Sequence, residues 1–378
     1  MGFRFIHTAD WQIGKAFAQF ESTVGVQLRA VRLEAIDRIA KVGRERAIGH
    51  VVVAGDVFDS ELIDDHALRQ PLARMAAYPD VTWCLLPGNH DPGRGGGVWE
   101  RLLAFGMPSN VTPLLTASTY RIRSDVVLLP APLFAKQTAD DPTTWMDQAD
   151  RTEGDFRVGV AHGSVRGFGS LGEASVPIEA SRRQSAYLDY LALGDWHGTR
   201  TIAPGVWYSG TPERDSFAEN EPGHVLIVDI DEPGAEPQIE VVATGHYNWI
   251  ERRVVLSRIA DFEPIEREIA HLGAETRRTV LRLILEGAIK VSEAAELDRK
   301  VAELAAHLLS MRIDDRRLTI QAAISDRELL RDPALVAVAD RLIERGKGPN
   351  QIEARIAARA MRRLLTFAAD VARKEAAG

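Results

Sequence analysis

The sequence is poor in cysteine, in long apolar runs and in positive charge. Its 378 residues include one cysteine, Cys84, so no disulfide framework can form. No apolar run approaches the roughly 20 residues that a membrane-spanning helix needs, so we expect no membrane partner of that kind. The opening residues, Met1 to Phe5, lead directly into a strand-like segment and do not resemble a signal peptide. We therefore expect a cytoplasmic protein, associated with the nucleoid if it is bacterial.

The formal net charge is -8, which by itself argues against a sequence-independent DNA-binding surface. However, metal-binding carboxylates lower the formal count, and cations bound to them restore positive potential locally. The net charge therefore leaves a nucleic acid substrate open. The hydrophobic content of 45% is ordinary for a globular protein, and the length predicts two or three domains.

Five apolar segments each end in a loop that carries Asp, Asn or His side chains. The clearest segment is 81–86, which stops at Pro87-Gly88 and is followed by Asn89, His90 and Asp91. A continuous apolar strand of this kind is buried on both faces and belongs inside a sheet. In layered α/β folds, ligands bind at the carboxyl ends of such strands. The other four loops carry Asp10 and Gln12, Asp56 and Asp59, His162, and Asp195 with His197.

This set of side chains predicts a centre of two divalent cations. Two cations roughly 3.5–4 Å apart need a bridging carboxylate and several Asp, His or Asn ligands. Asp56, on the central loop, is the natural bridge. Asp195 and His197 are two residues apart, so one loop can supply a ligand to each cation. Asp10 is expected to bind one cation, and Asn89 and His162 the other.

The ligand types also limit the metal and suggest the reaction. Mixed oxygen and imidazole ligands favour manganese, iron or zinc over an all-oxygen calcium site. A water between two such cations would be deprotonated near neutral pH and attack a phosphorus in line. His90 is placed to protonate the leaving oxygen. Asp59 and Asp91 are placed to orient the ligands from behind.

Each motif alone also has a structural interpretation. Gly-Asn-His-Asp is a common turn, Gly55-Asp56 can simply precede a helix, and His162 before a glycine can be a hydrogen-bonded loop histidine. Polar groups that follow five predicted strands in this order are improbable by chance. Their conjunction favours the metal centre.

The sequence patterns change along the chain and divide it into three segments. Residues 1–246 alternate strand and helix patterns, which predicts a four-layer α/β/β/α sandwich. Residues 247–328 predict a smaller α/β capping domain without a metal-ligand cluster. Residues 329–378 predict a helical tail. The apolar positions expected to lie on one face of each tail helix are Leu335, Val338 and Leu342, and then Ile352, Ile356, Ala360, Leu364 and Phe367.

The order and wording of the loops resemble the calcineurin-like metallophosphoesterases, and among them the SbcD-type DNA-repair exonucleases (the meiotic recombination eleven family). The resemblance covers roughly residues 3–230. Its motifs are His7-Thr8-Ala9-Asp10-Trp11, Gly55-Asp56-Val57-Phe58-Asp59, Pro87-Gly88-Asn89-His90-Asp91 and Tyr208-Ser209-Gly210-Thr211-Pro212-Glu213-Arg214.

The resemblance implies a manganese-dependent exonuclease or endonuclease that processes DNA ends in double-strand break repair. It implies His90 as the catalytic histidine. It also implies two protein partners: an SbcC-type coiled-coil ATPase bound by the tail, and a second copy of the chain in a homodimer. The metal ligands that it implies are Asp10, Asp56, Asn89, His162 and His197.

Two positions depart from the family pattern. The first loop of the family has Asp-x-His, and here Gln12 stands in place of the histidine. The last loop has Gly-His-x-His, and here Asp195 stands in place of its first histidine. Gln12 offers only a neutral amide, a weaker ligand than imidazole, whereas Asp195 adds negative charge and favours a harder metal. We expect one metal position to bind weakly and the other to differ in preference.

Two other functions are compatible with the same residues. One is a phosphodiesterase that acts on a small nucleotide, with residues 247–328 as a substrate lid. The other is a catalytically weakened scaffold that binds DNA ends or the ATPase. The tail helices also have a second interpretation, in which they simply pack on the capping domain.

Overall fold

The computed structural model describes residues 2–152, 155–168, 176–321, 330 and 332–377. The chain forms two compact units, Met1–His246 and Tyr247–Gly378, and each is described here by itself. None of the helices in the described residues is both long enough and apolar enough to cross a membrane.

The first sheet of the N-terminal unit has six strands in the order β14-β13-β1-β2-β3-β4. Its central strands are parallel, and β13 and β14 add an antiparallel edge. Three helices pack on its outer face: α1 (Ser22–Glu45), α2 (Asp65–Ala76) and α3 (Val98–Phe105). The strands are β1 (Phe3–Thr8), β2 (His50–Val53), β3 (Thr82–Leu85), β4 (Val111–Pro113), β13 (His224–Ile230) and β14 (Gln238–Ala243).

The second sheet also has six strands, in the order β11-β12-β10-β7-β6-β5. The short helices η1 (Thr144–Gln148) and α4 (Arg182–Ser185) lie on its outer face, and β8 (Ser164–Val165) pairs with β9 (Pro177–Ile178). The strands are β5 (Tyr120–Arg123), β6 (Val126–Ala131), β7 (Phe156–His162), β10 (Tyr190–Gly194), β11 (Arg200–Ala203) and β12 (Val206–Tyr208).

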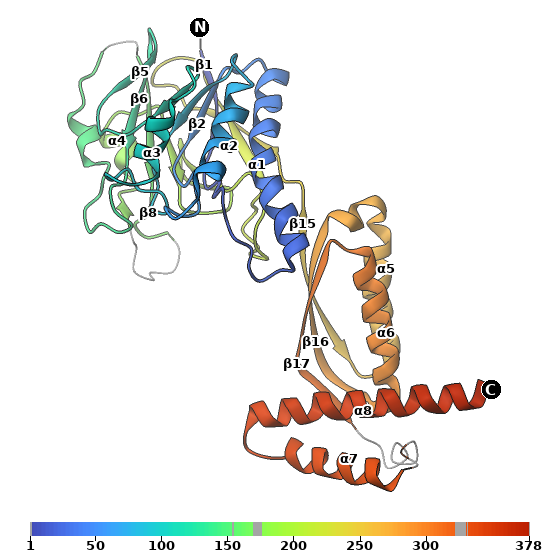
Figure 1. Ribbon diagram of the computed structural model, residues 1–378. Coiled ribbons are helices and arrows are strands. Elements are labelled where there is room, and N and C mark those ends of the chain that lie inside the picture. The colour runs from blue at the N-terminus through green and yellow to red at the C-terminus, as the bar shows by residue number, and fades with distance from the viewer. Residues whose placement is uncertain (1, 153–154, 169–175, 322–329, 331, 378) are drawn as a thin grey trace. The chain divides into compact units, whose positions relative to one another are not determined.

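The two sheets pack face to face through a shared apolar core. Phe5 and Val52 of the first sheet belong to the same buried cluster as Val158 and Tyr190 of the second, and all four are fully buried. Separate clusters join each sheet to its own helices. This arrangement confirms the predicted four-layer α/β/β/α sandwich (Figure 1).

The C-terminal unit contains a parallel three-stranded sheet, β15 (Asn248–Leu256), β16 (Thr279–Lys290) and β17 (Ser310–Gln321). Helices α5 (Glu263–His271) and α6 (Val291–His307), with the short helices η2 (Ile259–Phe262) and η3 (Gly273–Arg278), complete the module. Side chains of β16 alternate in burial: Leu281, Leu283 and Leu285 enter the core with α5 and α6, whereas Arg282 and Glu286 lie on the opposite face.

Helices α7 (Pro333–Gly346) and α8 (Gln351–Ala377) pack against each other, and α8 also contacts α6 and β17. Of the apolar positions predicted to share a face, Leu342, Ala360 and Leu364 are partly buried and the others are exposed. The core of the helix pair is formed by Ala339, Met361 and Leu365, with Leu330. The buried residues are Ala339, Ala357, Met361 and Leu365, and the exposed apolar ones are Leu335, Val338, Ile352, Ile356, Phe367 and Val371.

Candidate metal centre

The loops that follow β1, β2, β3, β7 and β10 meet where the two sheets adjoin. The backbone N–H of Asp10 donates to the carbonyl of Gly55 at 3.0 Å, and that of Gly163 donates to the carbonyl of Gly194 at 3.1 Å. The backbone N–H of Asp195 reaches both carboxylate oxygens of Asp10, at 3.2 and 3.3 Å. Loops from both sheets are therefore bonded to one another around a single point.

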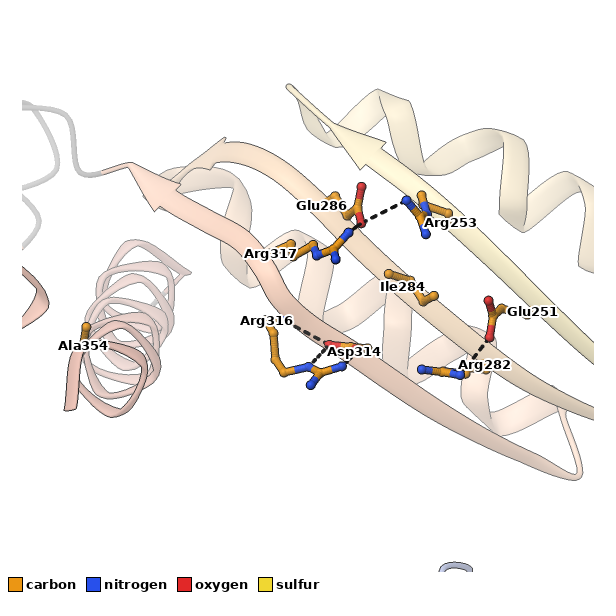
Figure 2. Close-up of a pocket in the computed structure, with 9 residues that line it drawn as sticks. All are labelled: Glu251, Arg253, Arg282, Ile284, Glu286, Asp314, Arg316, Arg317 and Ala354. Carbon is orange, nitrogen blue, oxygen red and sulfur yellow. Dashed lines mark hydrogen bonds and ion pairs between the residues drawn. The ribbon is translucent and has the colours of Figure 1, made fainter. Parts of the chain in front are cut away.

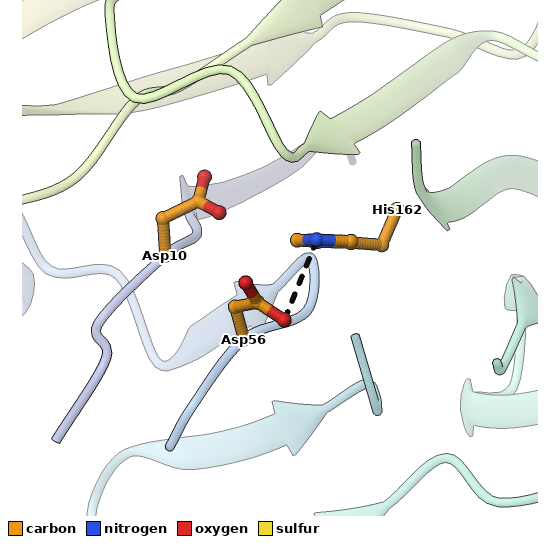
Figure 3. Close-up of side chains that lie close together, drawn as sticks. All are labelled: Asp10, Asp56 and His162. Atoms are coloured by element: carbon orange, nitrogen blue, oxygen red, sulfur yellow. Dashed lines mark ion pairs between the residues drawn. The ribbon is translucent and has the colours of Figure 1, made fainter. Parts of the chain in front are cut away.

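Asp10, Asp56 and His162 form what we call the central cluster. Each contributes one potential ligand atom, and the three atoms lie within 4.8 Å of one another (Figure 3). All three residues are buried, and Oδ1 of Asp56 lies 3.4 Å from Nε2 of His162. The cluster thus places two carboxylates and one imidazole where a single cation can contact all three.

The tautomer of His162 is fixed by the backbone. Its Nδ1 lies 2.9 Å from the carbonyl oxygen of Ala54, which can only accept, so Nδ1 carries the proton. Its Nε2 is buried and has no hydrogen-bond partner among the described residues. A histidine that donates from one nitrogen to a carbonyl and presents the other nitrogen to a group of carboxylates has the arrangement of a metal ligand.

Glycine is required at two positions beside this cluster. A Cβ on Gly88 would lie 2.1 Å from Oδ1 of Asp56, and a Cβ on Gly194 would lie 1.9 Å from the carbonyl oxygen of Ala54. Any larger residue at either position would displace a residue that shapes the cluster. Gly88 follows β3, and Gly194 ends β10. Because glycine has no Cβ, the loops can approach each other closely at these two positions.

Several site residues adopt strained backbone conformations. The φ angles of Asp10, Gln12, Asp56 and Asp195 are 54°, 43°, 52° and 102°. Positive φ is uncommon for residues with a Cβ and costs about 1–3 kcal/mol per position. All four residues lie in the loops that meet at this site.

The electrostatics of the cluster reflect several acids in a buried space. Burial raises the pKa of the Asp10 carboxyl to about 6, although the neighbouring charge of His162 opposes this rise. Burial lowers the pKa of His162, but the negative charge of Asp56 and its neighbours outweighs that effect and raises it to about 9. The site therefore attracts positive charge, which a proton or a metal ion can supply.

Asn89 and His90 lie next to the central cluster on the loop after β3. Oδ1 of Asn89 is buried without a hydrogen-bond partner among the described residues. The backbone N–H of His90 donates to Oδ1 of Asp56 at 2.9 Å, and its Nδ1 lies 2.8 Å from the backbone carbonyl of Asp59. Its Nε2 lies 3.9 Å from Oδ2 of Asp56, and its side chain is 47% exposed. His90 therefore borders both the cluster and the solvent.

Asp91 and Asp59 act on the loops in different ways. The buried carboxylate of Asp91 accepts from the backbone N–H groups of Phe58 and Gly88, at 3.0 and 2.6 Å, and ties two loops together. The group of Asp59 that orients His90 is its carbonyl, not its carboxylate. The side chain of Asp91 thus positions two loops, and the backbone carbonyl of Asp59 positions the ring of His90.

Asp195 faces the central cluster through one of its oxygens. Its Oδ1 lies 3.9 Å from Nε2 of His162, and its Oδ2 accepts a hydrogen bond from Oγ of Ser164 at 2.7 Å. Ser164 is a site residue that the sequence motifs do not identify. Its only signal in the sequence is its position two residues after His162.

The remaining two predicted ligands, Gln12 and His197, contact each other. Nε2 of Gln12 lies 3.1 Å from Nε2 of His197. Two further residues that the sequence motifs do not identify contact this pair. Nζ of Lys15 donates to Oε1 of Gln12 at 2.9 Å, and Oδ1 of Asp215 lies 3.8 Å from Nδ1 of His197. Asp215 directly follows a stretch that carries the family resemblance, which is its only signal in the sequence.

These residues fit a divalent cation. Two buried ligand atoms, Nε2 of His162 and Oδ1 of Asn89, have no hydrogen-bond partner among the described residues, and buried polar atoms rarely remain so. The acids Asp10, Asp56 and Asp195 supply negative charge beside His162. Oxygen and imidazole donors together suit manganese, iron or zinc.

Comparison with known proteins identifies the family. The model of the calcineurin-like phosphoesterases matches residues 3–246. The chain belongs to the calcineurin-like phosphoesterase family. This membership confirms the family predicted from the loops, and it makes the chain a metal-dependent phosphoester hydrolase.

One curated relative of this phosphoesterase is the DNA double-strand break repair protein Mre11 of Methanosarcina acetivorans. The two are 26% identical over 263 residues, which is 66% of this chain and 40% of that protein. The similarity supports the predicted SbcD-type branch of the family.

Solved structures with similar folds include TT1561 of Thermus thermophilus and a dimetal phosphatase from Danio rerio. The first is 9% identical, with a TM-score of 0.42, and covers 65% of this chain and all of that one. The second is 11% identical, with a TM-score of 0.35, and covers 63% of this chain and 98% of that one.

The raised pKa of His162 predicts that metal affinity depends on pH. A metal must displace the proton on Nε2, so affinity for Mn²⁺ should rise about tenfold per pH unit from about pH 6.5 to about pH 8.5, below the pKa of about 9. Isothermal titration calorimetry at several pH values, in buffers of different ionisation enthalpy, measures both the affinity and the released proton. A pH-independent affinity would contradict the assignment of His162.

The same shift affects the metal-free protein. The folded pKa of His162 lies above its usual value of 6.5, so its contribution to folding stability is complete below pH 6.5 and is lost as the pH rises towards 9. The variant His162→Gln is the control, since it has no titrating group at this position and should lose both dependences.

Proposed function

We propose that this phosphoesterase is a metal-dependent DNA exonuclease or endonuclease that hydrolyses phosphodiester bonds at DNA ends during double-strand break repair. One observation carries the proposal: the buried cluster of Asp10, Asp56 and His162 lies in a chain that is similar to Mre11. The cation proposed is Mn²⁺, with Mg²⁺, Fe²⁺ or Zn²⁺ as substitutes.

In this proposal, the residues of the chain have two roles, metal binding and proton donation. Asp56, Asn89, His162 and Asp195, together with Asp10, would hold a cation. When bound, such a cation supplies Lewis-acid activation of the phosphodiester and of water. His90 donates a proton to the leaving oxygen.

The geometry of His90 supports its role as a general acid. The Asp59 carbonyl fixes the proton of His90 on Nδ1, so Nε2 is the nitrogen that exchanges a proton with substrate. Oδ2 of Asp56 lies 3.9 Å from this nitrogen, so Nε2 points towards the central cluster. Because the side chain is 47% exposed, a substrate entering from solvent can reach it.

The capping domain, residues 247–328, is proposed to contact DNA through the exposed face of its sheet. A pocket of about 720 Å³ on this face is lined by Arg253, Arg282, Arg316 and Arg317 against three acids (Figure 2). Oε1 of Glu286 is shared by two arginines, Arg253 at 3.4 Å and Arg317 at 2.9 Å. Because the two arginines share one carboxylate, each guanidinium group can still bind a DNA phosphate.

The tail, residues 329–378, is proposed to dock the coiled coil of an SbcC-type ATPase. Ile352, Ile356, Phe367 and Val371 are 61%, 64%, 71% and 53% exposed. Their spacing places them along one face of α8, away from Met361 and Leu365 in the core of the helix pair. An exposed apolar stripe of this kind marks a surface for a helical partner.

A homodimer is also part of the proposal. Leu62, just before α2, is 94% exposed, and Leu103 on α3 is 49% exposed. Both belong to the helical region of the N-terminal unit. Exposed leucines are a natural contact between two copies of a chain.

Hydrolysis is tested with linear duplex DNA and with bis-p-nitrophenyl phosphate in the presence of Mn²⁺. We expect both to be cleaved. His90→Gln should lower kcat about 10²–10⁴-fold without loss of metal, because it removes the proton donor. His66→Gln, at an exposed histidine of α2, is the matched control and should retain full activity.

The alternatives correspond to other outcomes of this assay. Cleavage of bis-p-nitrophenyl phosphate alone would indicate a phosphodiesterase for small nucleotides. A metal-loaded protein that cleaves neither substrate but binds DNA ends would indicate a scaffold.

Two substitutions of opposite effect test the DNA surface. Arg253→Ala with Arg317→Ala should weaken binding to duplex DNA and reduce the salt dependence by about two phosphate contacts. Glu286→Gln should strengthen binding, since it removes the carboxylate that competes with phosphate for both arginines. Fluorescence anisotropy over a salt series measures both effects.

The control for this surface is Arg299→Ala. Arg299 lies on α6, is 55% exposed and is paired with Glu303, so it matches the tested arginines in exposure and pairing. Loss of DNA affinity in this variant equal to that in the sheet variants would refute the assignment of the sheet face.

Docking of the ATPase is tested with Ile356→Asp and Phe367→Asp. Each should abolish co-purification with an SbcC-type ATPase from the same organism, while hydrolysis of bis-p-nitrophenyl phosphate stays unchanged, because neither side chain is in a core. Val241→Asp, at an apolar residue of β14 that is 47% exposed, is the matched control. Undiminished co-purification with both tail variants would exclude this docking surface.

A further inference from the structure

Four side chains beside the central cluster form a closed network of hydrogen bonds and ion pairs, which we call the Gln12 network. Nζ of Lys15 donates to Oε1 of Gln12 at 2.9 Å and to Oδ2 of Asp215 at 2.7 Å. Nε2 of Gln12 lies 3.1 Å from Nε2 of His197, and Nδ1 of His197 lies 3.8 Å from Oδ1 of Asp215. The network therefore joins two of the predicted metal ligands to a lysine and an aspartate.

The lysine determines how the amide of Gln12 is oriented. An ammonium group can only donate, so the Gln12 atom that faces Lys15 must be the oxygen. The amide nitrogen then faces His197 and donates to its Nε2. The two atoms that could bind a metal here, Oε1 of Gln12 and Nε2 of His197, are both occupied by hydrogen bonds within the protein.

The network is anchored from behind. The side chain of Asp215 is 3% exposed and also accepts from Nη1 of Arg32 at 3.3 Å. Arg32 is itself buried, and its Nη2 donates to the backbone carbonyl of Asp10 at 3.0 Å. Buried charges resist separation from their partners because an uncompensated charge would remain. Gln12 and Lys15 are therefore held in this arrangement by residues that cannot readily move.

The other flank of the cluster is open by comparison. Nε2 of His162 and Oδ1 of Asn89 have no hydrogen-bond partner among the described residues, and Asp195 presents one oxygen towards His162 while Ser164 donates a hydrogen bond to the other. This flank thus offers ligand atoms without partners and an additional negative charge. On the flank with Gln12, both candidate ligand atoms already have partners, and Lys15 adds positive charge.

We propose that this chain binds one divalent cation tightly, at Asp10, Asp56 and His162 with Asn89 and Asp195, and that Lys15 acts through Gln12 to keep His197 out of coordination. A second cation has to break the Gln12 network and approach an ammonium group. The inference rests on the proposed metal centre and specifies its occupancy. Lys15 is a positioning residue that decides how many ions are bound.

The test measures metal stoichiometry instead of activity. Isothermal titration calorimetry of the full chain with MnCl₂ should give one tight site, and a second ion should bind at least about 100-fold more weakly. Electron paramagnetic resonance at two equivalents of Mn²⁺ should show an isolated ion. Lys15→Met, and separately Gln12→His with Lys15→Met, should bring the second affinity within about tenfold of the first and give the signal of a coupled pair.

Two controls define the result. Lys41→Met, at a lysine of α1 that is 75% exposed, should keep a stoichiometry of one. Asp56→Asn should abolish tight binding, because Asp56 belongs to the central cluster. Circular dichroism of each variant establishes that it is folded, and the two network variants give independent chances of a folded protein.

The inference is overturned if the unmodified chain binds two ions with affinities within tenfold, or if both folded network variants keep a stoichiometry of one. The proposed function fails separately. A chain that binds one ion but cleaves neither DNA nor bis-p-nitrophenyl phosphate refutes the nuclease and leaves this inference intact. A chain that binds two ions equally and cleaves DNA refutes this inference and leaves the proposed nuclease intact.

Discussion

The burial of carboxylates beside one another is the constraint on which the N-terminal unit depends. Asp10 and Asp56 are buried side by side; burial raises the energy of the Asp10 charge, and repulsion from Asp56 adds to it. Only a positive charge placed between them relieves this repulsion, and His162 supplies part of it when protonated. A cation that binds to the folded chain therefore stabilises the fold with both carboxylates charged.

The two-sheet architecture determines where this repulsion occurs. Asp10, Asp56 and Asn89 follow strands of the first sheet, whereas His162 and Asp195 lie at the ends of strands of the second. The carbonyl of Ala54, after β2, fixes the ring of His162, at the end of β7, so one hydrogen bond joins the loops of both sheets. The apolar core between the sheets is therefore also a positioning element, since any sliding of one sheet would separate the ligands.

Much of the site could be predicted from the sequence because its ligands follow apolar strands directly. The run 81–86 and the segments before Asp10 and Asp56 locate a sheet edge without knowledge of any distance. The Gln12 network could not be predicted. Lys15 lies in an irregular loop, and Asp215 is 200 residues away from it. Their contact depends on how two distant loops meet, which no local pattern encodes.

The tail shows a second limit of sequence patterns. Periodicity correctly predicts helices in residues 333–346 and 351–377 and an apolar face on each, but it does not say whether that face is buried. In the structure, Ala339, Met361 and Leu365 lie in the core of the helix pair, whereas Ile352, Ile356 and Phe367 are exposed. A stripe of large apolar residues can be either a core or a docking surface, and only the packing of both helices distinguishes them.

The two departures from the family pattern act in the same direction. Asp195 in place of a histidine adds negative charge to the flank where His162 and Asn89 have ligand atoms without partners among the described residues. Gln12 in place of a histidine removes a ligand from the other flank and accepts a hydrogen bond from the ammonium of Lys15. Each change alone would shift the balance between two metal positions. Asp195 adds anionic charge at one position, and Gln12 removes a ligand beside Lys15 at the other, which is the charge distribution of a site with one strong cation position.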